Sequence, residues 1–198
     1  IIFRDLGLRK YEEIAIGMKA FTDERQPETN DEVWILEHES VYTYGVSTDP
    51  KKIPAHLSHP TLRSDRGGKI TYHGPGQMVV YILMDFNRAS MKPKEFIAKF
   101  QSAIYKTVKN YCKDAVLNED EDGIFLDNLK LASFGLKITK KGSYHGAAIN
   151  HSMNLDAWNE IVICGNPDHR AIDIRSLGIS VSRAEMVEEI EKNLLLEF

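Results

Sequence analysis

Apolar residues recur every three or four positions in three parts of the chain, which is the spacing of amphipathic helices. The first part runs from Leu8 to about Arg25, and the second begins at Pro93, a residue favoured in the first turn of a helix. The third follows Ser182, which starts the capping-box pattern Ser-x-x-Glu. The expected inward-facing residues are Leu8, Tyr11, Ile14, Met18 and Phe21, then Phe96, Phe100, Ile104 and Val108, and finally Val187, Ile190 and Leu194.

Short apolar runs bounded by glycine, proline and polar turn residues predict β-strands. Three of them lie between Gly123 and Met153, separated by the turns Asp127-Asn128 and Lys140–Gly142, so we expect three sequential antiparallel strands there. By contrast, Ser47–Arg63 contains three prolines and predicts an irregular loop. The predicted strands are Val33–Glu37, Val41–Gly45, Ile70–Tyr72, Met78–Met84, Gly123–Leu126, Lys130–Ile138, Ser143–Met153 and Ile161–Ile163.

The predicted strands and helices do not alternate along the chain, which argues against a doubly wound parallel sheet. The pattern instead predicts an α+β fold, with a mixed, largely antiparallel sheet packed by helices. A chain of 198 residues is long enough to bury a sizeable core without disulfide staples. We therefore expect one domain over residues 1–198, and a monomer.

Charge and cysteine content narrow the functional classes. The formal net charge of -4 argues against bulk nucleic-acid binding. Two cysteines and no signal-like apolar segment predict a cytoplasmic protein, and no apolar run approaches the length of a membrane span. His56 and His59 are close in sequence, but no third ligand stands near them at a usable spacing, so we expect no metal site.

Arg66–Gln77 is the most unusual stretch of the chain, with four glycines, a proline, an arginine and a histidine between two otherwise ordinary segments, and its second glycine pair lies between two predicted strands. Glycine allows a ligand to approach the main chain closely, and loops between buried strands often carry function. The stretch therefore predicts a binding loop. A tight surface turn is the alternative explanation of its glycines.

The two cysteines differ in their surroundings. Cys112 continues the helical spacing from Val108, which is typical of a structural cysteine on an apolar face. Cys164 follows the predicted strand Ile161–Ile163 and precedes Gly165-Asn166-Pro167, so its side chain is expected where the chain leaves the core. A nucleophile and a structural residue both remain open for Cys164 on this pattern alone.

Four segments together resemble one family. Arg66–Gln77 reads R-G-G-x-x-T-Y-H-G-x-G-Q, and it is followed by Lys130–Gly135 (K-L-A-S-F-G), Tyr144–Asn150 (Y-H-G-A-A-I-N) and Cys164-Gly165. These motifs closely resemble the octanoyl-acyl-carrier-protein:protein octanoyltransferases, the lipoate-protein ligase B family. The resemblance extends from about Trp34 to Gly178, and it implies the sheet found in the catalytic domains of biotin- and lipoate-protein ligases.

The resemblance also implies a set of site residues. Cys164 would attack an acyl thioester and hold the acyl group covalently, with Lys130 as its catalytic partner. His145 is expected to be structural, and the residue before Cys164 is Ile163 where the family commonly has proline. The substrate-binding residues implied are Arg66, Gly67, Gly68, Lys69, Ile70, Thr71, Tyr72, His73, Ser133, Phe134, Gly135, Gly146, Ala147 and Ala148.

Two roles are expected for Lys130. A free cysteine has a pKa of about 8.5, so only about 3% is thiolate at pH 7, and a nearby cation raises that fraction. A buried lysine could also accept a proton from an incoming amine. A solvated strand lysine is the alternative, and only the family context distinguishes Lys130 from its neighbours. Main-chain N–H groups of the glycine-rich loop and of Gly146–Ala148 are candidates for stabilising the tetrahedral oxyanion.

The resemblance implies octanoyl-acyl carrier protein as donor. It implies the lipoyl domains of 2-oxoacid dehydrogenase complexes and the glycine cleavage H protein as acceptors, with no cofactor. An ATP-dependent lipoate or biotin-type protein ligase is the first alternative, but it needs no acyl-carrying cysteine, and the chain lacks a Gly-Arg-Gly-Arg run. A non-catalytic module that binds acyl carriers or lipoyl domains is the second. A thioester trapped on Cys164 would exclude it.

Overall fold

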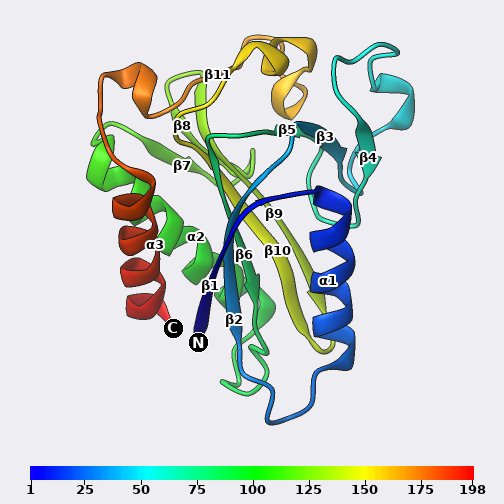
Figure 1. The fold of residues 1–198 in the computed structure, drawn as a ribbon, viewed down its shortest axis with the longest axis vertical. Helices are drawn as coiled ribbons and strands as arrows, with labels where there is room; N and C mark the ends of the chain where they lie inside the picture. The colour runs from blue at the N-terminus through cyan, green and yellow to red at the C-terminus, as the bar shows by residue number, and fades with distance from the viewer.

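A twisted sheet of eight strands forms the centre of the molecule, and the computed structural model describes all residues from 1 to 198 (Figure 1). The strand order is β1-β2-β6-β10-β9-β8-β7, and β11 pairs with β9. The β1–β2 and β11–β9 pairs are parallel and all the others are antiparallel, which confirms a mixed, largely antiparallel sheet. The strands are β1 (Ile2–Arg9), β2 (Glu32–His38), β6 (Gln77–Leu83), β7 (Val116–Asn118), β8 (Gly123–Leu126), β9 (Leu129–Thr139), β10 (Gly142–Asn150) and β11 (Arg170–Ala171).

Helices cover both faces of this sheet, which explains why β6 is apolar at almost every position. Helix α1 (Tyr11–Glu24) lies on one face, and α2 (Pro93–Tyr111) and α3 (Arg183–Glu197) lie together on the other (Figure 1). Because successive side chains of a strand point to opposite faces, β6 supplies both cores. Val79, Tyr81 and Leu83 pack with α1 residues, whereas Met78, Val80 and Ile82 belong to the larger core under α2 and α3.

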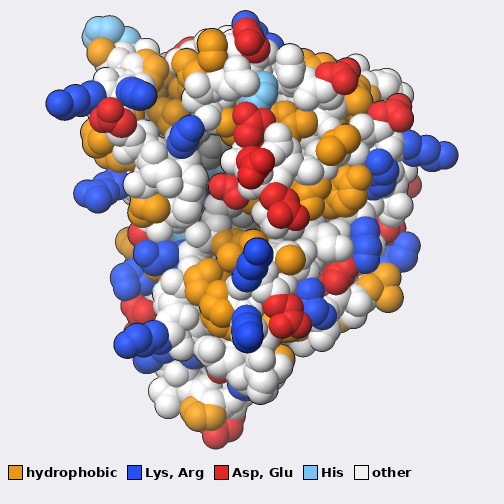
Figure 2. Space-filling model, turned by 180° about the vertical axis from the view of Figure 1, so that it is seen from behind, with side chains coloured by type: hydrophobic (Ala, Val, Ile, Leu, Met, Phe, Trp, Pro, Cys, Tyr) orange, Lys and Arg blue, Asp and Glu red, His pale blue; other side chains and the backbone are white.

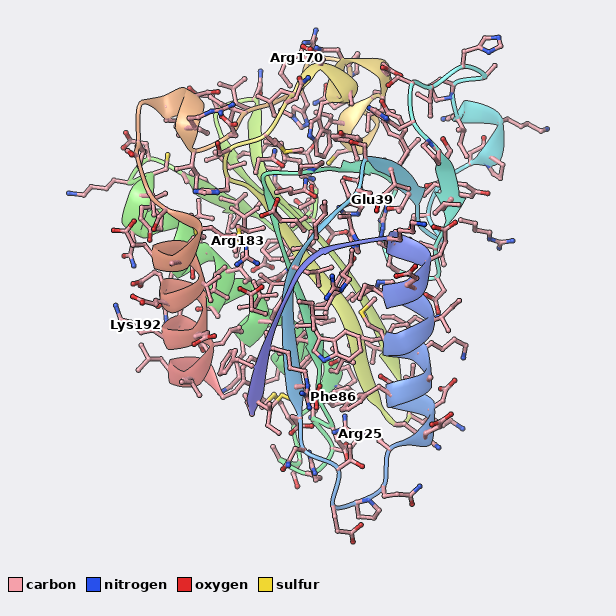
Figure 3. All side chains as sticks on the ribbon, in the orientation of Figure 1. Arg25, Glu39, Phe86, Arg170, Arg183 and Lys192 are labelled. Atoms are coloured by element: carbon pink, nitrogen blue, oxygen red, sulfur yellow. The ribbon has the colours of Figure 1, made fainter.

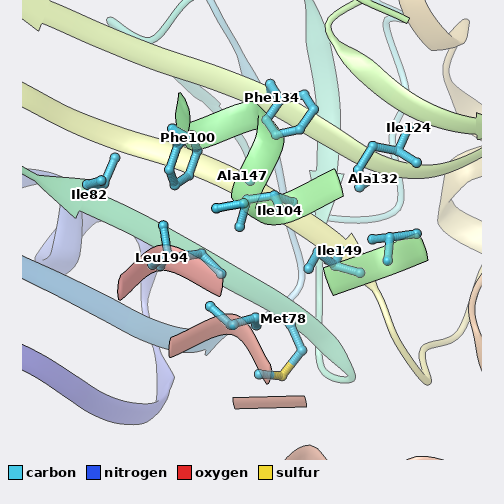
Figure 4. Close-up of a cluster of buried hydrophobic side chains, with 14 of the residues drawn as sticks. Met78, Ile82, Phe100, Ile104, Ile124, Ala132, Phe134, Ala147, Ile149 and Leu194 are labelled. Carbon is cyan, nitrogen blue, oxygen red and sulfur yellow. The ribbon is translucent and has the colours of Figure 1, made fainter. Parts of the chain in front are cut away.

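The larger core confirms the predicted stripes of α2 and α3. The four predicted residues of α2 are completely buried, as are Ile190 and Leu194 of α3, while Val187 is partly buried. Figure 4 shows Phe100, Ile104 and Leu194 meeting side chains of the sheet. The capping box is also present, since the Ser182 hydroxyl accepts from the Glu185 N–H and the Glu185 carboxylate accepts from the Ser182 N–H. Cys112 is buried in this core, as predicted for a structural residue.

The N-terminal prediction was wrong at its start. The helix begins at Tyr11, and Leu8 belongs to β1, an edge strand that pairs in parallel with β2. The register shifts between Asp5 and Gly7, and Gly7 has a φ of 63°, which marks an irregularity that only glycine adopts easily. Leu8 is half exposed, so its apparent place on the helical stripe was coincidental.

Arginine 183 links the two ends of the chain. Its guanidinium donates to both carboxylate oxygens of Asp5 in β1 and to Glu37 in β2. Figure 3 shows Arg183 reaching from the start of α3 toward β1. This contact fastens the edge of the large sheet to the helix layer.

A second, three-stranded sheet stands beside the large one. It has the order β4-β3-β5, with β3 (Val41–Tyr44), β4 (Thr61–Arg63) and β5 (Ile70–His73). The strands predicted at Val41–Gly45 and Ile70–Tyr72 are thus confirmed, whereas the loop predicted at Ser47–Arg63 contains β4 and a 3₁₀ turn at Pro50–Lys52. This sheet positions the glycine-rich loop, which lies between β4 and β6.

The strand predicted at Ile161–Ile163 is absent, and this changes the setting of Cys164. Ile163–Gly165 is a 3₁₀ turn in which Cys164 itself has a φ of 54°. Ile161 and Ile163 are buried and Val162 is half exposed, an alternation that imitates a strand. The two isoleucines are buried by packing with Tyr42, Tyr72 and Trp158 rather than by a sheet.

Candidate active site

A cavity of about 280 Å³ opens between the glycine-rich loop, β9, β10 and the turn that carries Cys164. Figure 2 shows a hollow on this face with acidic side chains along its border. The structure brings fourteen of the sixteen predicted site residues to the cavity wall. These are Arg66, Gly68, Lys69, Ile70, Thr71, His73, Lys130, Ser133, Phe134, Gly135, Gly146, Ala147, Ala148 and Cys164.

Tyr72 and Gly67 do not line the cavity. Thr71 and His73 face it, so Tyr72 between them in β5 points the other way, where its hydroxyl donates to Ser40 and its ring packs near Tyr42. The Gly67 N–H donates to the Leu136 carbonyl, which joins the loop to β9. Their role in substrate binding therefore stays a prediction.

Seven residues that the sequence reasoning missed complete the wall. Tyr81 lies within the predicted strand Met78–Met84, and neither Trp158 nor the acidic run at 120–122 belongs to a recognised motif. No spacing pattern links these segments to Cys164, because they meet only through the tertiary fold. The missed residues are Ser47, Tyr81, Asp120, Glu121, Asp122, Trp158 and Ile163.

Arg66 fixes the shape of the glycine-rich loop from inside. Its guanidinium donates to the side-chain and backbone oxygens of Thr43 and to the carbonyls of Gly67 and Lys69, at 2.8–3.2 Å. Burial lowers the pKa of Arg66, yet a guanidinium remains protonated because its ordinary pKa is above 12. The loop is therefore held around a buried cation that forms no salt bridge with a carboxylate.

Lys130 and Cys164 lie in direct contact. The Lys130 Nζ is 2.9 Å from the Cys164 Sγ, although the residues are 34 positions apart in sequence. Lys130 is only 4% exposed, so it is not the solvated strand lysine of the alternative reading. Both groups also reach the backbone carbonyl of Glu121, with distances of 3.2 Å from Nζ and 3.3 Å from Sγ. This arrangement can stabilise a thiolate, because an ammonium in hydrogen-bond contact favours negative charge on sulfur.

The backbone at Cys164 is unusual for a residue with a side chain. Its φ of 54° lies in the left-handed region, which costs a non-glycine residue about 1 kcal/mol or more, and Gly165 follows with a φ of 79°. The Lys69 Nζ donates to the Cys164 carbonyl at 2.7 Å. A Cβ added to Gly165 would lie 2.9 Å from the same nitrogen. The turn thus aims the thiol into the cavity while Lys69 holds its carbonyl.

The two predicted histidines differ in position. His73 lines the cavity and is buried, with Nδ1 donating to Gln77 at 2.8 Å and Nε2 accepting from the Thr43 hydroxyl at 3.3 Å. Burial, with the nearby His38 and Arg66 charges, lowers the pKa of His73 well below its ordinary value, so the ring is neutral. His145 does not line the cavity. It donates to Asp65 at 3.0 Å, and burial lowers its pKa too.

The N–H groups of Gly146–Ala148 are not available for an oxyanion, contrary to the expectation from sequence. These residues pair with β6 on one side and with β9 on the other, so their N–H groups point toward neighbouring strands. Near the thiol, the N–H groups of Gly165 and Asn166 donate to the carbonyls of Val162 and Ile163. These five main-chain donors are thereby engaged.

No group of three or more His, Cys, Asp or Glu side chains is arranged to bind a metal ion. His59 packs its ring against Tyr42 and Tyr72 instead.

None of the helices has both the length and the apolar character needed to cross a bilayer.

Comparisons with solved structures agree with the fold. A lipoate-protein ligase A bound with ATP matches with a TM-score of 0.71 at 13% identity, covering 99% of this chain and 83% of the other. A bipartite lipoate protein ligase from Thermoplasma acidophilum matches at 0.69 and 14%, covering 100% and 84%. Biotin protein ligase from Aquifex aeolicus matches at 0.56 and 8%, covering 100% and 68%. At these identities the likeness concerns the fold alone.

Sequence comparisons reach further. The octanoyltransferase of Nitrosomonas eutropha is 34% identical over 197 residues, covering 100% of this chain and 88% of the relative. That of Laribacter hongkongensis is 37% identical over 191 residues, covering 96% and 92%. The family model for the lipoyl protein ligase A/B catalytic domain matches residues 10–195. The chain therefore belongs to the lipoyl protein ligase A/B catalytic-domain family, within which these relatives are octanoyltransferases.

Proposed function

We propose that the chain is an acyltransferase that moves an octanoyl group from octanoyl-acyl carrier protein to a lysine of a lipoyl domain, by way of a thioester on Cys164. The relatives of similar length are octanoyltransferases. The observation that carries the proposed mechanism is the 2.9 Å contact between Lys130 and Cys164 at the wall of a cavity. Lipoyl domains of 2-oxoacid dehydrogenase complexes and the glycine cleavage H protein are the proposed acceptors.

The first step forms the acyl-enzyme. The Cys164 sulfur, stabilised as a thiolate by Lys130, attacks the carbonyl carbon of the donor thioester. A carbon–sulfur bond to Cys164 forms and the bond to the donor sulfur breaks. The departing thiolate receives a proton from the Lys130 ammonium, which is in contact with the reacting sulfur of Cys164.

The second step releases the acyl group to the acceptor. The lysine amine of the lipoyl domain attacks the thioester carbon, an amide bond forms, and the Cys164 thiolate leaves. The attacking nitrogen must lose a proton, and Lys130, now neutral, accepts it. Lys130 thus returns to the ammonium form beside the thiolate, ready for the next donor.

The cavity supplies the binding energy for the acyl chain. Binding an octanoyl group removes about seven methylene and methyl groups from water. At about 0.8 kcal/mol for each group, this burial contributes on the order of 5 kcal/mol to the free energy of binding. Phe134, Gly146, Ala147 and Ala148 give the wall apolar surface, while Arg66 and His73 are already hydrogen-bonded within the protein.

The direct test is intact-protein mass spectrometry after mixing with octanoyl-acyl carrier protein. We expect one octanoyl adduct, removed by hydroxylamine, on the native protein. Cys164→Ser should show no thioester adduct, and the matched control Cys112→Ser should behave like the native protein because Cys112 is buried in the core. A hydroxylamine-sensitive adduct on the Cys164→Ser variant would overturn the assignment.

An ATP-dependent lipoate or biotin-type protein ligase is the second candidate, favoured by the fold shared with such ligases. The two activities separate in one assay. We expect transfer from the acyl carrier to proceed in EDTA without nucleotide. Turnover only with ATP and free octanoate or lipoate would favour the second candidate.

A further inference from the structure

The Lys130–Cys164 pair places a primary amine against a thiol that opens into the cavity. The N–S distance is 2.9 Å, and Cys164 is half-buried while Lys130 is enclosed. A thiol stabilised as thiolate and reachable from solvent is the kind that hydrogen peroxide oxidises to a sulfenic acid. The fate of that sulfenic acid depends on the nucleophile nearest to it.

Two common partners of a sulfenic acid are not available here. A second thiol would give a disulfide, but Cys112, the other cysteine of the chain, is buried in the core under α2. The backbone nitrogen of the next residue would give a cyclic sulfenamide, but the Gly165 N–H donates to the Val162 carbonyl within the turn. The amine of Lys130 is the group that remains in contact with the sulfur.

We propose that hydrogen peroxide converts this pair into a reversible sulfenamide cross-link between Lys130 and Cys164. In the first step the thiolate attacks one oxygen of peroxide, the S–O bond forms, the O–O bond breaks, and the departing hydroxide takes a proton from the Lys130 ammonium and leaves as one water. In the second step the deprotonated Lys130 nitrogen attacks sulfur, the S–N bond forms, the S–O bond breaks, and the hydroxyl leaves with a proton from nitrogen as a second water. Two thiols of a reductant restore the amine and the thiol and are themselves oxidised to a disulfide.

The cross-link makes both the Lys130 amine and the Cys164 thiol unreactive at the same time. It protects the sulfur from further oxidation to sulfinic acid, which reductants do not reverse. Under the proposed function it also blocks acyl transfer until a thiol reductant acts. That consequence rests on the proposed function, whereas the cross-link itself does not.

Peptide mapping of the full-length native protein tests the proposal. After exposure to graded hydrogen peroxide, we expect a peptide pair containing Lys130 and Cys164 that is lighter by two hydrogen atoms than the sum of the separate peptides. Dithiothreitol should restore the separate peptides. A pair that retains an oxygen atom, or a link to Lys69 in place of Lys130, would overturn the sulfenamide.

Two variants test whether the Lys130 amine is the group that reacts with Cys164. Lys130→Met retains the apolar stem but has no amine, so we expect dimedone to trap a sulfenic acid on Cys164, which then gains further oxygen at the same peroxide dose. Lys137→Met is the matched control, because it removes another amine of β9 that does not line the cavity, and it should still form the cross-link. If the native protein reaches sulfinic acid as fast as Lys130→Met, with no linked peptide, the proposal fails. Octanoyl loading of Cys164, measured separately, would still stand in that case.

Discussion

The side-chain nitrogen of Lys69 lies 2.7 Å from the backbone carbonyl oxygen of Cys164, and so joins the glycine-rich loop to the turn that carries the thiol. The Lys69 carbonyl is in turn held by the buried Arg66 guanidinium at 2.8 Å. The left-handed backbone of Cys164 is thus supported from a loop 95 positions earlier in the chain. This contact gives Lys69 a positioning role that its place in a binding motif did not reveal.

Replacing Lys69 by methionine should lower kcat for acyl transfer about fivefold with little change in KM for the donor. A charge-assisted hydrogen bond contributes about 1 kcal/mol where the lysine is open to water, and its loss lets the turn relax away from Lys130. Lys69→Arg should restore most of the rate, and Lys51→Met, an exposed lysine elsewhere, should change nothing. If KM rises while kcat is unchanged, Lys69 contacts the donor instead.

Two substitutions of Lys130 distinguish its role as a cation beside the thiol from its role as a base. Arginine keeps a positive charge but does not act as a base, so Lys130→Arg should accumulate acyl-enzyme and release it about 100-fold more slowly to the acceptor. Lys130→Ala should already acylate slowly, with alkylation of Cys164 at neutral pH reduced about tenfold.

Single-turnover measurements that time acylation and release separately check both expectations. Lys137→Arg, a substitution further along β9, serves as the control. Normal release by Lys130→Arg would remove the base role. An unchanged alkylation rate in Lys130→Ala would remove the electrostatic role.

Stability should fall as pH drops below about 6.5, partly because of His38. Burial lowers the pKa of His38 to about 4, and its ring bonds the Arg9 carbonyl at 3.0 Å and the Tyr81 hydroxyl at 2.8 Å. The unfolded chain therefore binds one more proton than the folded chain between pH 6.5 and 4. This makes the free energy of unfolding decrease by about 1.4 kcal/mol per pH unit, on the order of 3 kcal/mol in all.

Urea denaturation at a series of pH values measures this loss. His73 and His145 also have lowered pKa values, so the native slope should exceed that of one group. His38→Gln should reduce the slope by about one proton over that range. Identical slopes in the two proteins would show that His38 is already protonated in the folded state.

The length of the acyl chain should be limited by the end of the cavity. One methylene more or less changes affinity only about fourfold through burial, so strong discrimination requires a clash. With Tyr81, Ala147 and Ala148 in the wall and a volume of about 280 Å³, we expect hexadecanoyl carriers to react far more slowly than octanoyl carriers. Comparison of acylation rates across a chain-length series tests this, and equal rates would mean that the cavity opens at its far end.

Local sequence patterns predicted the helices and strands whose buried residues recur at a regular spacing. The stripes of α2 and α3 and the meander from β8 to β10 follow from spacings of four and two, and the structure confirms them. The parallel pairing of β1 with β2 was not visible, because the partners are about 30 residues apart and β1 has a weak apolar pattern broken at Gly7. Pairings of this kind depend on the whole sheet.

The candidate active site shows the same contrast between features that the sequence predicts and features that it does not. Motif residues on the loop and on β10 could be named in advance, since glycines and a cysteine in fixed order are visible in sequence. Their geometry could not, because the turn at Cys164 depends on contacts from Lys69 and Glu121, on two other segments. Likewise, a motif does not show that Thr71 and His73 face the cavity while Tyr72, between them, points the other way.

The link from Arg183 to Asp5 has a consequence for how the protein is made. The two residues are 178 positions apart, so the edge strand and the last helix meet only after nearly all of the described chain has left the ribosome. Until then α2 lacks Met186, Ile190 and Leu194, which complete its core. Growing chains that stop before residue 183 would expose that apolar surface and a loose sheet edge, and they are the species on which chaperones would act.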